Sequence, residues 1–297
     1  MTKKNKSGIE YLEQNHINWF PGHMKKAVEQ IQQNIKLVNI IIEVRDARAP
    51  MASGNKENYQ SRGQKPYLIV LNKTNLADPD VVLSWEKWFT KQNESFVFIN
   101  ALDKKSIKTI IKQAKKIIHA HHLKSNPTAP PKDKMKMMIL GLPNTGKSTI
   151  INKLAGRDAS KAASKPGQTK ATLWVKAGEG LDILDTPGVM PPRIDVQIHA
   201  MWLAAIHAIP DHVIKPDYSA CFLVELLLNL KSPGFKKHYK LETLEIDILA
   251  VCNHIGKLRG CLRSGGDYDY EHIYKIILSD FRKGAFGPIC FEQPPVK

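Results

Sequence analysis

Short apolar runs and helical stripes alternate along the first two thirds of the chain. The run from Leu37 to Val44 is apolar and rich in β-branched residues, and those from Tyr67 to Leu71 and from Phe96 to Ile99 are similar. Continuous apolar runs of this length are typical of strands buried on both faces, so we expect three strands here. Helices are expected around and between them over residues 24–34, 82–91 and 104–119.

The stretch 104–119 has the clearest amphipathic pattern. One face is apolar and consists of Ile107, Ile110, Ile111, Ala114, Ile117 and Ile118. The other face is basic and consists of Lys104, Lys108, Lys112, Lys115 and Lys116. These lysines are compatible both with a merely solvated helix face and with a surface for a polyanion.

A proline-rich break at residues 123–134 predicts a linker. After it, a helix is expected over residues 147–154. Three more strands are expected over residues 135–140, 171–177 and 181–185, the last two as a pair. Alternating strands and helices predict an α/β fold whose doubly wound, mostly parallel sheet is covered by helices on both faces.

The pattern changes after Pro191-Pro192. Helices are expected over residues 195–208, 219–230, 241–257 and 269–282, and no clear strand pattern lies between them. We therefore expect two domains: an α/β domain over residues 1–192 and a smaller all-helical domain over residues 193–297 that begins near residue 194.

Charge is distributed unevenly between these two parts. The chain has a formal net charge of +16; residues 1–192 hold 31 Lys or Arg and 16 Asp or Glu, whereas residues 193–297 hold 13 and 12. Such asymmetry suggests a polyanionic partner for the first part. No apolar stretch is long enough to span a membrane, and the four cysteines lack zinc-site spacing, so we expect a cytoplasmic protein without a membrane partner.

The segment Gly141 to Thr149, GLPNTGKST, follows an expected strand and opens an expected helix. This is the context that the phosphate-binding pattern G-x-x-x-x-G-K-[ST] requires. Its glycines let backbone N–H groups approach phosphate oxygens at a helix N-terminus. Lys147 is expected to reach the β- and γ-phosphates, and Ser148 to bind Mg²⁺. The other expected nucleotide contacts in the loop are Asn144, Thr145, Gly146 and Thr149.

A second phosphate-site segment, Asp185-Thr186-Pro187-Gly188, ends a short expected strand about 40 residues later. Asp185 is expected to hold Mg²⁺ through water, and the N–H of Gly188 to meet the γ-phosphate. Between the two segments, Thr169 is expected to act as a switch threonine that closes on Mg²⁺.

The sequence Asn72-Lys73-Thr74-Asn75 follows the strand that ends at Leu71 and resembles the guanine-reading N-K-x-D motif of GTPases. Asn100-Ala101 follows the next strand and resembles the element that supports the base. In ordinary GTPases both come after the phosphate loop, whereas here both precede it. This order is that of circularly permuted GTPases, which a parallel sheet tolerates because every nucleotide loop still leaves the carboxyl end of a strand.

Further segments resemble the YlqF/RbgA-type ribosome-biogenesis GTPases. They are Ile17 to Met24, INWFPGHM; Asp46-Ala47-Arg48-Ala49-Pro50; and the tail from Arg259 to Arg282. The resemblance covers nearly the whole chain. It implies a GTPase acting in assembly of the large ribosomal subunit, with ribosomal RNA as partner and a helical C-terminal domain that contacts the ribosome. A monomer is expected.

Two positions depart from the N-K-x-D and base-supporting patterns. Asn75 replaces the aspartate whose carboxylate accepts hydrogen bonds from guanine, and losing a bond to a charged group costs roughly 1.5–3 kcal/mol. We therefore expect weaker guanine discrimination and better acceptance of xanthine, with continued use of GTP. Asn100 in place of serine is a milder change.

The sequence also lacks the water-orienting glutamine that many GTPases use in catalysis. Val189 stands where many GTPases place a water-orienting glutamine, so intrinsic turnover is expected to be slow. Asn144 is expected to hold K⁺ near the phosphates, as in related GTPases, and the resemblance implies a catalytic role for His23; turn formation by Asn144 and a packing or RNA role for His23 are the alternatives. A nucleotide-gated RNA-binding chaperone with negligible hydrolysis is the second functional hypothesis.

Overall fold

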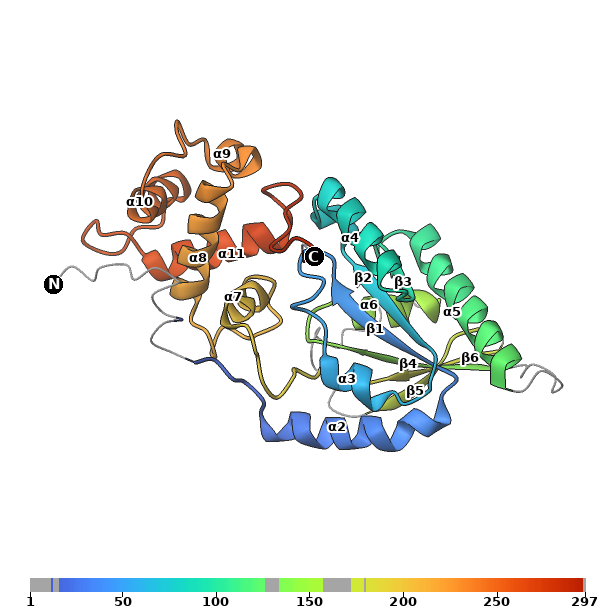
Figure 1. The fold of residues 1–297 in the computed structure, drawn as a ribbon. Coiled ribbons are helices and arrows are strands. Elements are labelled where there is room, and N and C mark those ends of the chain that lie inside the picture. The colour runs from blue at the N-terminus through green and yellow to red at the C-terminus, as the bar shows by residue number, and fades with distance from the viewer. Residues whose placement is uncertain (1–11, 13–15, 126–133, 157–171, 179, 296–297) are drawn as a thin grey trace. The chain divides into compact units, whose positions relative to one another are not determined.

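A computed structural model describes residue 12 and residues 16–125, 134–156, 172–178 and 180–295 (Figure 1). They form two compact units. One consists of Phe20–Arg193 together with the tail that starts at Cys290, and the other consists of Ile194–Ile289 together with the described residues up to Trp19. Each unit is described by itself below.

The first unit is built on a six-stranded sheet with the strand order β3-β2-β1-β4-β6-β5. The strands are β1 (Ile40–Asp46), β2 (Tyr67–Asn72), β3 (Phe96–Phe98), β4 (Met135–Gly141), β5 (Leu173–Lys176) and β6 (Leu181–Asp185). Every neighbouring pair is parallel except β5 and β6, which pair in antiparallel fashion. The mostly parallel α/β sheet expected from the sequence is thereby confirmed.

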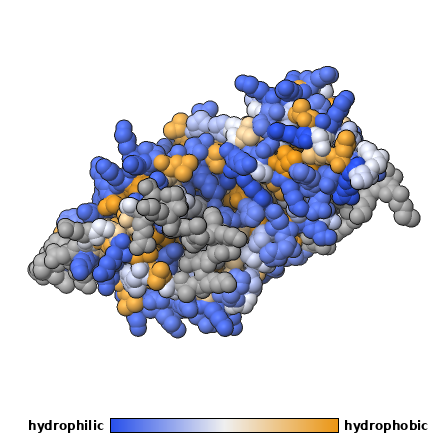
Figure 2. All heavy atoms as spheres, turned by 180° about the vertical axis from the view of Figure 1, so that it is seen from behind, coloured by the Kyte–Doolittle hydropathy of each residue, from blue (hydrophilic) through white to orange (hydrophobic). Residues whose placement is uncertain are grey.

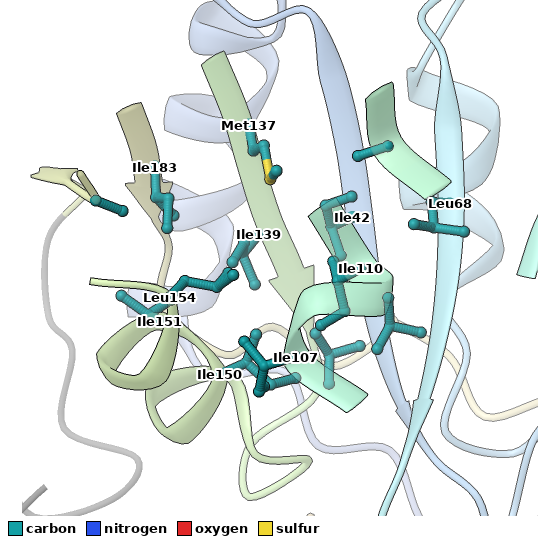
Figure 3. Close-up of a cluster of buried hydrophobic side chains, with 14 of the residues drawn as sticks. Ile42, Leu68, Ile107, Ile110, Met137, Ile139, Ile150, Ile151, Leu154 and Ile183 are labelled. Carbon is teal, nitrogen blue, oxygen red and sulfur yellow. The ribbon is translucent and has the colours of Figure 1, made fainter. Parts of the chain in front are cut away.

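One face of the sheet packs against two helices, α5 (Lys104–Ser125) and α6 (Lys147–Leu154). Alternate strand residues such as Ile42, Leu68 and Ile139 point toward Ile110 and Ile150 of these helices (Figure 3). Because side chains alternate along a strand, burial of every residue of β1 means that the opposite face is covered as well. The lysine stripe of α5 stays exposed, as the amphipathic pattern predicted.

Other helices of this unit complete its layers. They are α2 (Gly22–Asn34), α3 (Lys56–Ser61) and α4 (Pro79–Lys91). Asp78 caps α4 by accepting hydrogen bonds from the N–H groups of Asp80 and Val81, which explains why this helix begins earlier than the apolar stripe indicated. The short helix α3 has no apolar periodicity and was missed by the sequence pattern.

Two further expected boundaries in this unit were wrong. The strand expected from Leu37 begins at Ile40, because the N–H of Val38 bonds to the carbonyl of Ile35 and closes a 3₁₀ turn over Ile35–Leu37. The linker expected over residues 123–134 begins too early, since α5 continues to Ser125. Only the residue before Pro127 is restricted by the proline ring, so the helix can extend this far. Residues 126–133 lie outside the described part.

The second unit is helical in its described part. Its helices are α7 (Gln197–Ala205), α8 (Pro216–Asn229), α9 (Pro233–Tyr239), α10 (Ile248–Arg259) and α11 (Tyr270–Arg282). The helix expected over 241–257 begins at Ile248, where the Asp247 side chain accepts from the N–H of Ala250. The short helix α9 was missed; Ser232 caps it through the N–H of Phe235.

The C-terminal segment returns to the sheet unit. The N–H of Phe291 donates to the carbonyl of Arg48 at 2.8 Å, and Glu292 Oε1 accepts from the N–H groups of Met51 and Ala52. Burial raises the pKa of Glu292 to about 7 despite these two hydrogen bonds. No local sequence pattern predicts this docking, because it depends on contacts between residues about 240 positions apart.

The surface agrees with the composition of the chain. The face drawn in Figure 2 is largely hydrophilic, with apolar side chains in small groups. Within the described residues, no helix combines the length and the apolar character needed to cross a membrane.

Candidate nucleotide site

The expected nucleotide segments follow strands β2, β3, β4 and β6. These four strands are parallel, so their carboxyl ends lie at the same edge of the sheet. Loops at this edge are the usual ligand-binding elements of open α/β sheets. Segments that are about 30 to 110 residues apart in the sequence are thus brought together by strand order alone.

The base-reading segment contacts the phosphate loop directly. The side-chain amide of Asn72 donates to the carbonyl of Thr145 at 2.9 Å, and the ammonium of Lys73 donates to the carbonyl of Asn144 at 2.7 Å. Asn72 Oδ1 accepts from the N–H of Ala101 at 3.0 Å. Asn72 therefore joins the three loops that follow β2, β3 and β4.

This close approach depends on a glycine. A Cβ at Gly146 would clash with the side-chain amide of Asn72, and the backbone of Gly146 is left-handed, with a φ of 100°. Only glycine adopts this conformation readily and leaves the space that Asn72 occupies. The second glycine of the phosphate pattern thus has a packing role as well as its expected role toward phosphate.

Lys147 begins α6 at the end of the phosphate loop. Its ammonium donates to the carbonyl of Leu142 at 2.7 Å. Burial lowers the pKa of Lys147 to about 8, and the neighbouring Asp185 carboxylate opposes this shift. A polyphosphate would add negative charge beside this buried lysine and thereby favour its protonated form.

The segment after β6 lies against the phosphate loop. The N–H of Val189 donates to the carbonyl of Gly141 at 3.3 Å, and a Cβ added at Gly188 would lie 2.9 Å from the backbone nitrogen of Pro143. The side chain of Val189 is buried, with 1% exposure. The position after Gly188 is therefore filled by packed hydrocarbon.

Asp185 fits a bound cation. Its Oδ1 is buried and has no hydrogen-bond partner among the described residues, and burial raises its pKa. An unpaired buried carboxylate oxygen is costly, and Mg²⁺, which prefers oxygen ligands, would relieve this cost. Ser148 lies in the first turn of α6, which starts at the same edge of the sheet. The residues present are thus suited to Mg²⁺.

The remaining expected site residues differ in their placement. Asn75 is exposed and Asn100 half-buried, each just beyond its strand, and Thr74 donates its N–H to the carbonyl of Ile99.

His23 is exposed in the first turn of α2, beside Met24, whose sulfur accepts from the N–H of Met190. Thr149 follows Ser148 in α6. Thr169 lies outside the described residues.

One charged residue at this edge was not singled out as a site residue from the sequence. Asp46, the last residue of β1, is fully buried, and its Oδ2 lies 2.9 Å from the ammonium of Lys73. The guanidinium of Arg48 binds both of its carboxylate oxygens, at 2.9 Å each. Its position at the carboxyl end of a buried strand was the signal that could have identified it.

Comparisons with known proteins agree with this geometry. A family described as "50S ribosome-binding GTPase" matches residues 136–253. The match begins in β4, directly before the phosphate loop. The base-reading segments lie upstream of it, as a permuted order requires.

Similar proteins extend over nearly the whole chain. Ribosome biogenesis GTPase A of Bacillus licheniformis is 36% identical over 278 residues, covering 94% of this chain and 98% of the relative. Mitochondrial ribosome-associated GTPase 1 of Bos taurus is 30% identical, covering 93% and 88%. The crystal structure of GNP-bound YlqF from T. maritima matches with a TM-score of 0.68 and 28% identity, covering 92% and 100%. The chain therefore belongs to the family of ribosome biogenesis GTPases of the YlqF/RbgA type.

Proposed function

We propose that this protein hydrolyses GTP as an assembly factor of the large ribosomal subunit. The observation that carries the proposal is the direct contact between the base-reading segment and the phosphate loop. Asn72 and Lys73 donate hydrogen bonds to carbonyls of this loop at one edge of the sheet. A base-reading segment fixed to a phosphate loop binds both ends of one nucleotide. The relatives named for ribosome biogenesis supply the cellular process.

Each group of the site has a proposed task. Lys147 and the N–H groups at the start of α6 hold the β- and γ-phosphates, and Ser148 and Asp185 hold Mg²⁺, which neutralises phosphate charge. The N–H of Gly188 contacts the γ-phosphate, so the position of the segment after β6 depends on whether a γ-phosphate is bound. We assign base recognition to Asn72, Lys73, Thr74, Asn75, Asn100 and Ala101, and further phosphate-loop contacts to Thr145, Gly146 and Thr149.

Hydrolysis needs help that this chain supplies only in part. The buried Val189 cannot orient water, so we assign a catalytic role to His23, next to the residue that contacts Met190. Asn144 is proposed to hold K⁺ close to the phosphates, where a cation stabilises developing charge. His23→Ala tests the first assignment: it should abolish stimulation of turnover by large-subunit particles, and full stimulation would refute it.

The proposed partner is ribosomal RNA in the large subunit or its precursor. The excess of positive charge lies in the first 192 residues, and the exposed lysines of α5 are one candidate contact. All proposed nucleotide-binding groups come from one chain, so we propose a monomer. Because the proposed partner is a ribosomal particle, we also propose that the protein is cytoplasmic. The helical unit is proposed to contribute further contacts with the particle.

Nucleotide-dependent co-sedimentation tests this function. Purified protein is spun with large-subunit particles in the presence of a GTP analogue, GDP or XTP. Preferential association in the GTP-analogue state supports an assembly switch. Association that is equal in all nucleotide states, or absent, contradicts it.

A further inference from the structure

Asp46 connects the base-reading segment to a strand that carries none of the proposed nucleotide contacts. Asp46 is the last residue of β1, which lies between β2 and β4 in the sheet. It pairs in register with Asn72 of β2. Its carboxylate is fully buried. Such a group is stable only if its charge is compensated nearby, so its partners define its role.

Both partners are cations. Arg48 Nε donates to Oδ1, and the Nη2 of Arg48 donates to Oδ2, each at 2.9 Å; the N–H of Arg48 also donates to Oδ1 at 3.1 Å. Lys73 lies 2.9 Å from Oδ2. Burial opposes ionisation of Asp46, but the charges of Arg48 and Lys73 outweigh burial and hold its pKa well below the ordinary value.

Lys73 is constrained from two sides. Its ammonium contacts Asp46 and also donates to the carbonyl of Asn144 in the phosphate loop. Its backbone adopts the left-handed conformation, with a φ of 67°, which is uncommon for a residue with a side chain. A flexible lysine side chain would ordinarily sample many rotamers, and this pair of contacts restricts it to those that span β1 and the phosphate loop.

The loop that follows Asp46 is itself held in place. Arg48 accepts the N–H of Phe291 at its carbonyl, and Ser53 donates its N–H and hydroxyl to the carbonyl of Ala49. Ser53 Oγ in turn accepts from the N–H of Asp46 at 2.9 Å. Arg48 is therefore fixed by backbone contacts as well as by its bond to the carboxylate.

We propose that Asp46 is a positioning residue of the nucleotide site. Its carboxylate fixes the ammonium of Lys73 against the phosphate loop before nucleotide arrives, so that nucleotide binding does not have to order this side chain. The inference rests on the proposed binding of GTP and GDP by this site. It extends that function to a residue that contacts the nucleotide only through Lys73.

A double-mutant cycle tests the inference with GDP binding as the readout. Asp46→Asn keeps the shape of the side chain but removes its charge, and should raise the Kd for a fluorescent GDP about tenfold, a coupling within the range for residues in direct contact. In a Lys73→Met background, the same substitution should change the Kd by less than about twofold. A tenfold loss in both backgrounds, or no loss in the first, overturns the positioning role.

Glu43→Gln is the matched control. Glu43 is a buried carboxylate of the same strand, and it pairs with Arg45. Its substitution should lower the melting temperature but leave the same change in Kd in the presence and absence of Lys73. A nucleotide effect that depends on Lys73 in this control as well would reduce the role of Asp46 to general support of β1 and overturn the proposal.

A measurement on the unaltered protein covers the case in which Asp46→Asn fails to fold. In an NMR spectrum of lysine ammonium groups, with the Lys73 signal assigned by its loss in Lys73→Met, this signal should be protected from water exchange before GDP is added. A Lys73 ammonium that exchanges as fast as those of exposed lysines overturns the proposal. If the unaltered protein binds no GDP at all, the proposed function fails first, and the exchange rate of the Lys73 ammonium still decides whether this group is held in place without nucleotide.

Discussion

Substitution of Gly188 by alanine should separate the recognition of GTP from that of GDP. A Cβ at this position would lie 2.9 Å from the nitrogen and 3.0 Å from the Cα of Pro143. Favourable carbon contacts begin near 3.5 Å, so the two loops must move apart by roughly 0.5 Å. Both clashing atoms belong to the backbone, and forcing extra atoms into a packed contact costs about 1–3 kcal/mol.

The cost should fall mainly on the state that has a γ-phosphate, because only that state needs the N–H of Gly188 close to the phosphate loop. A cost of about 1–3 kcal/mol corresponds to a roughly 5- to 150-fold loss of affinity for the GTP analogue. Fluorescence titrations with a non-hydrolysable GTP analogue and with GDP measure the two affinities in parallel. Gly22→Ala is the control, since its added Cβ has no atom within 4 Å. An unchanged ratio of GTP-analogue to GDP affinity in Gly188→Ala would refute the reasoning.

Three further predictions concern the base, the cation and the tail. Asn75→Asp should restore two acceptor oxygens and raise the preference for GTP over XTP about ten- to a hundredfold, measured by competition binding; equal changes for both nucleotides contradict this. Asn144→Gly keeps the left-handed backbone, with φ 59°, but removes the amide oxygen, and should abolish the difference in GTPase rate between KCl and NaCl. Glu292 has a folded pKa of about 7, above its ordinary 4.5, so its contribution is present at low pH and is lost as the pH rises through 7. In denaturant titrations, Glu292→Gln should therefore raise the free energy of unfolding at pH 8 by on the order of 2 kcal/mol and leave it unchanged at pH 4.5. An equal effect at both pH values would contradict this.

The sequence predicted the parts of the fold that rest on local patterns. Continuous apolar runs identified β1 and β2, because strands buried on both faces need apolar side chains throughout. The strands β5 and β6 contain charged residues and were expected as a pair instead. The order of the base and phosphate segments predicted a permuted GTPase, since each segment follows a strand of a parallel sheet. Elements with weak periodicity, such as Lys56–Ser61 and Pro233–Tyr239, were missed because caps and tertiary contacts define them.

The site was predictable for residues within motifs and not for those that act through a partner. Lys147 and Asp185 belong to recognised patterns, and the structure brings them to one edge of the sheet. The bond of Asp46 to Lys73 joins residues 27 positions apart in number and depends on the register between β1 and β2. The docking of Glu292 depends on a chain return that no local pattern encodes.

GTP turnover by the purified protein, measured with and without large-subunit precursor particles, tests the central claim most directly. Because Val189 cannot orient water, turnover of the isolated protein should be slow. Particles should accelerate it at least about tenfold; for comparison, an arginine finger provides 10³–10⁵. Negligible hydrolysis under both conditions, with nucleotide-dependent binding to the particles intact, would contradict the claim and leave a nucleotide-gated RNA-binding chaperone as the function.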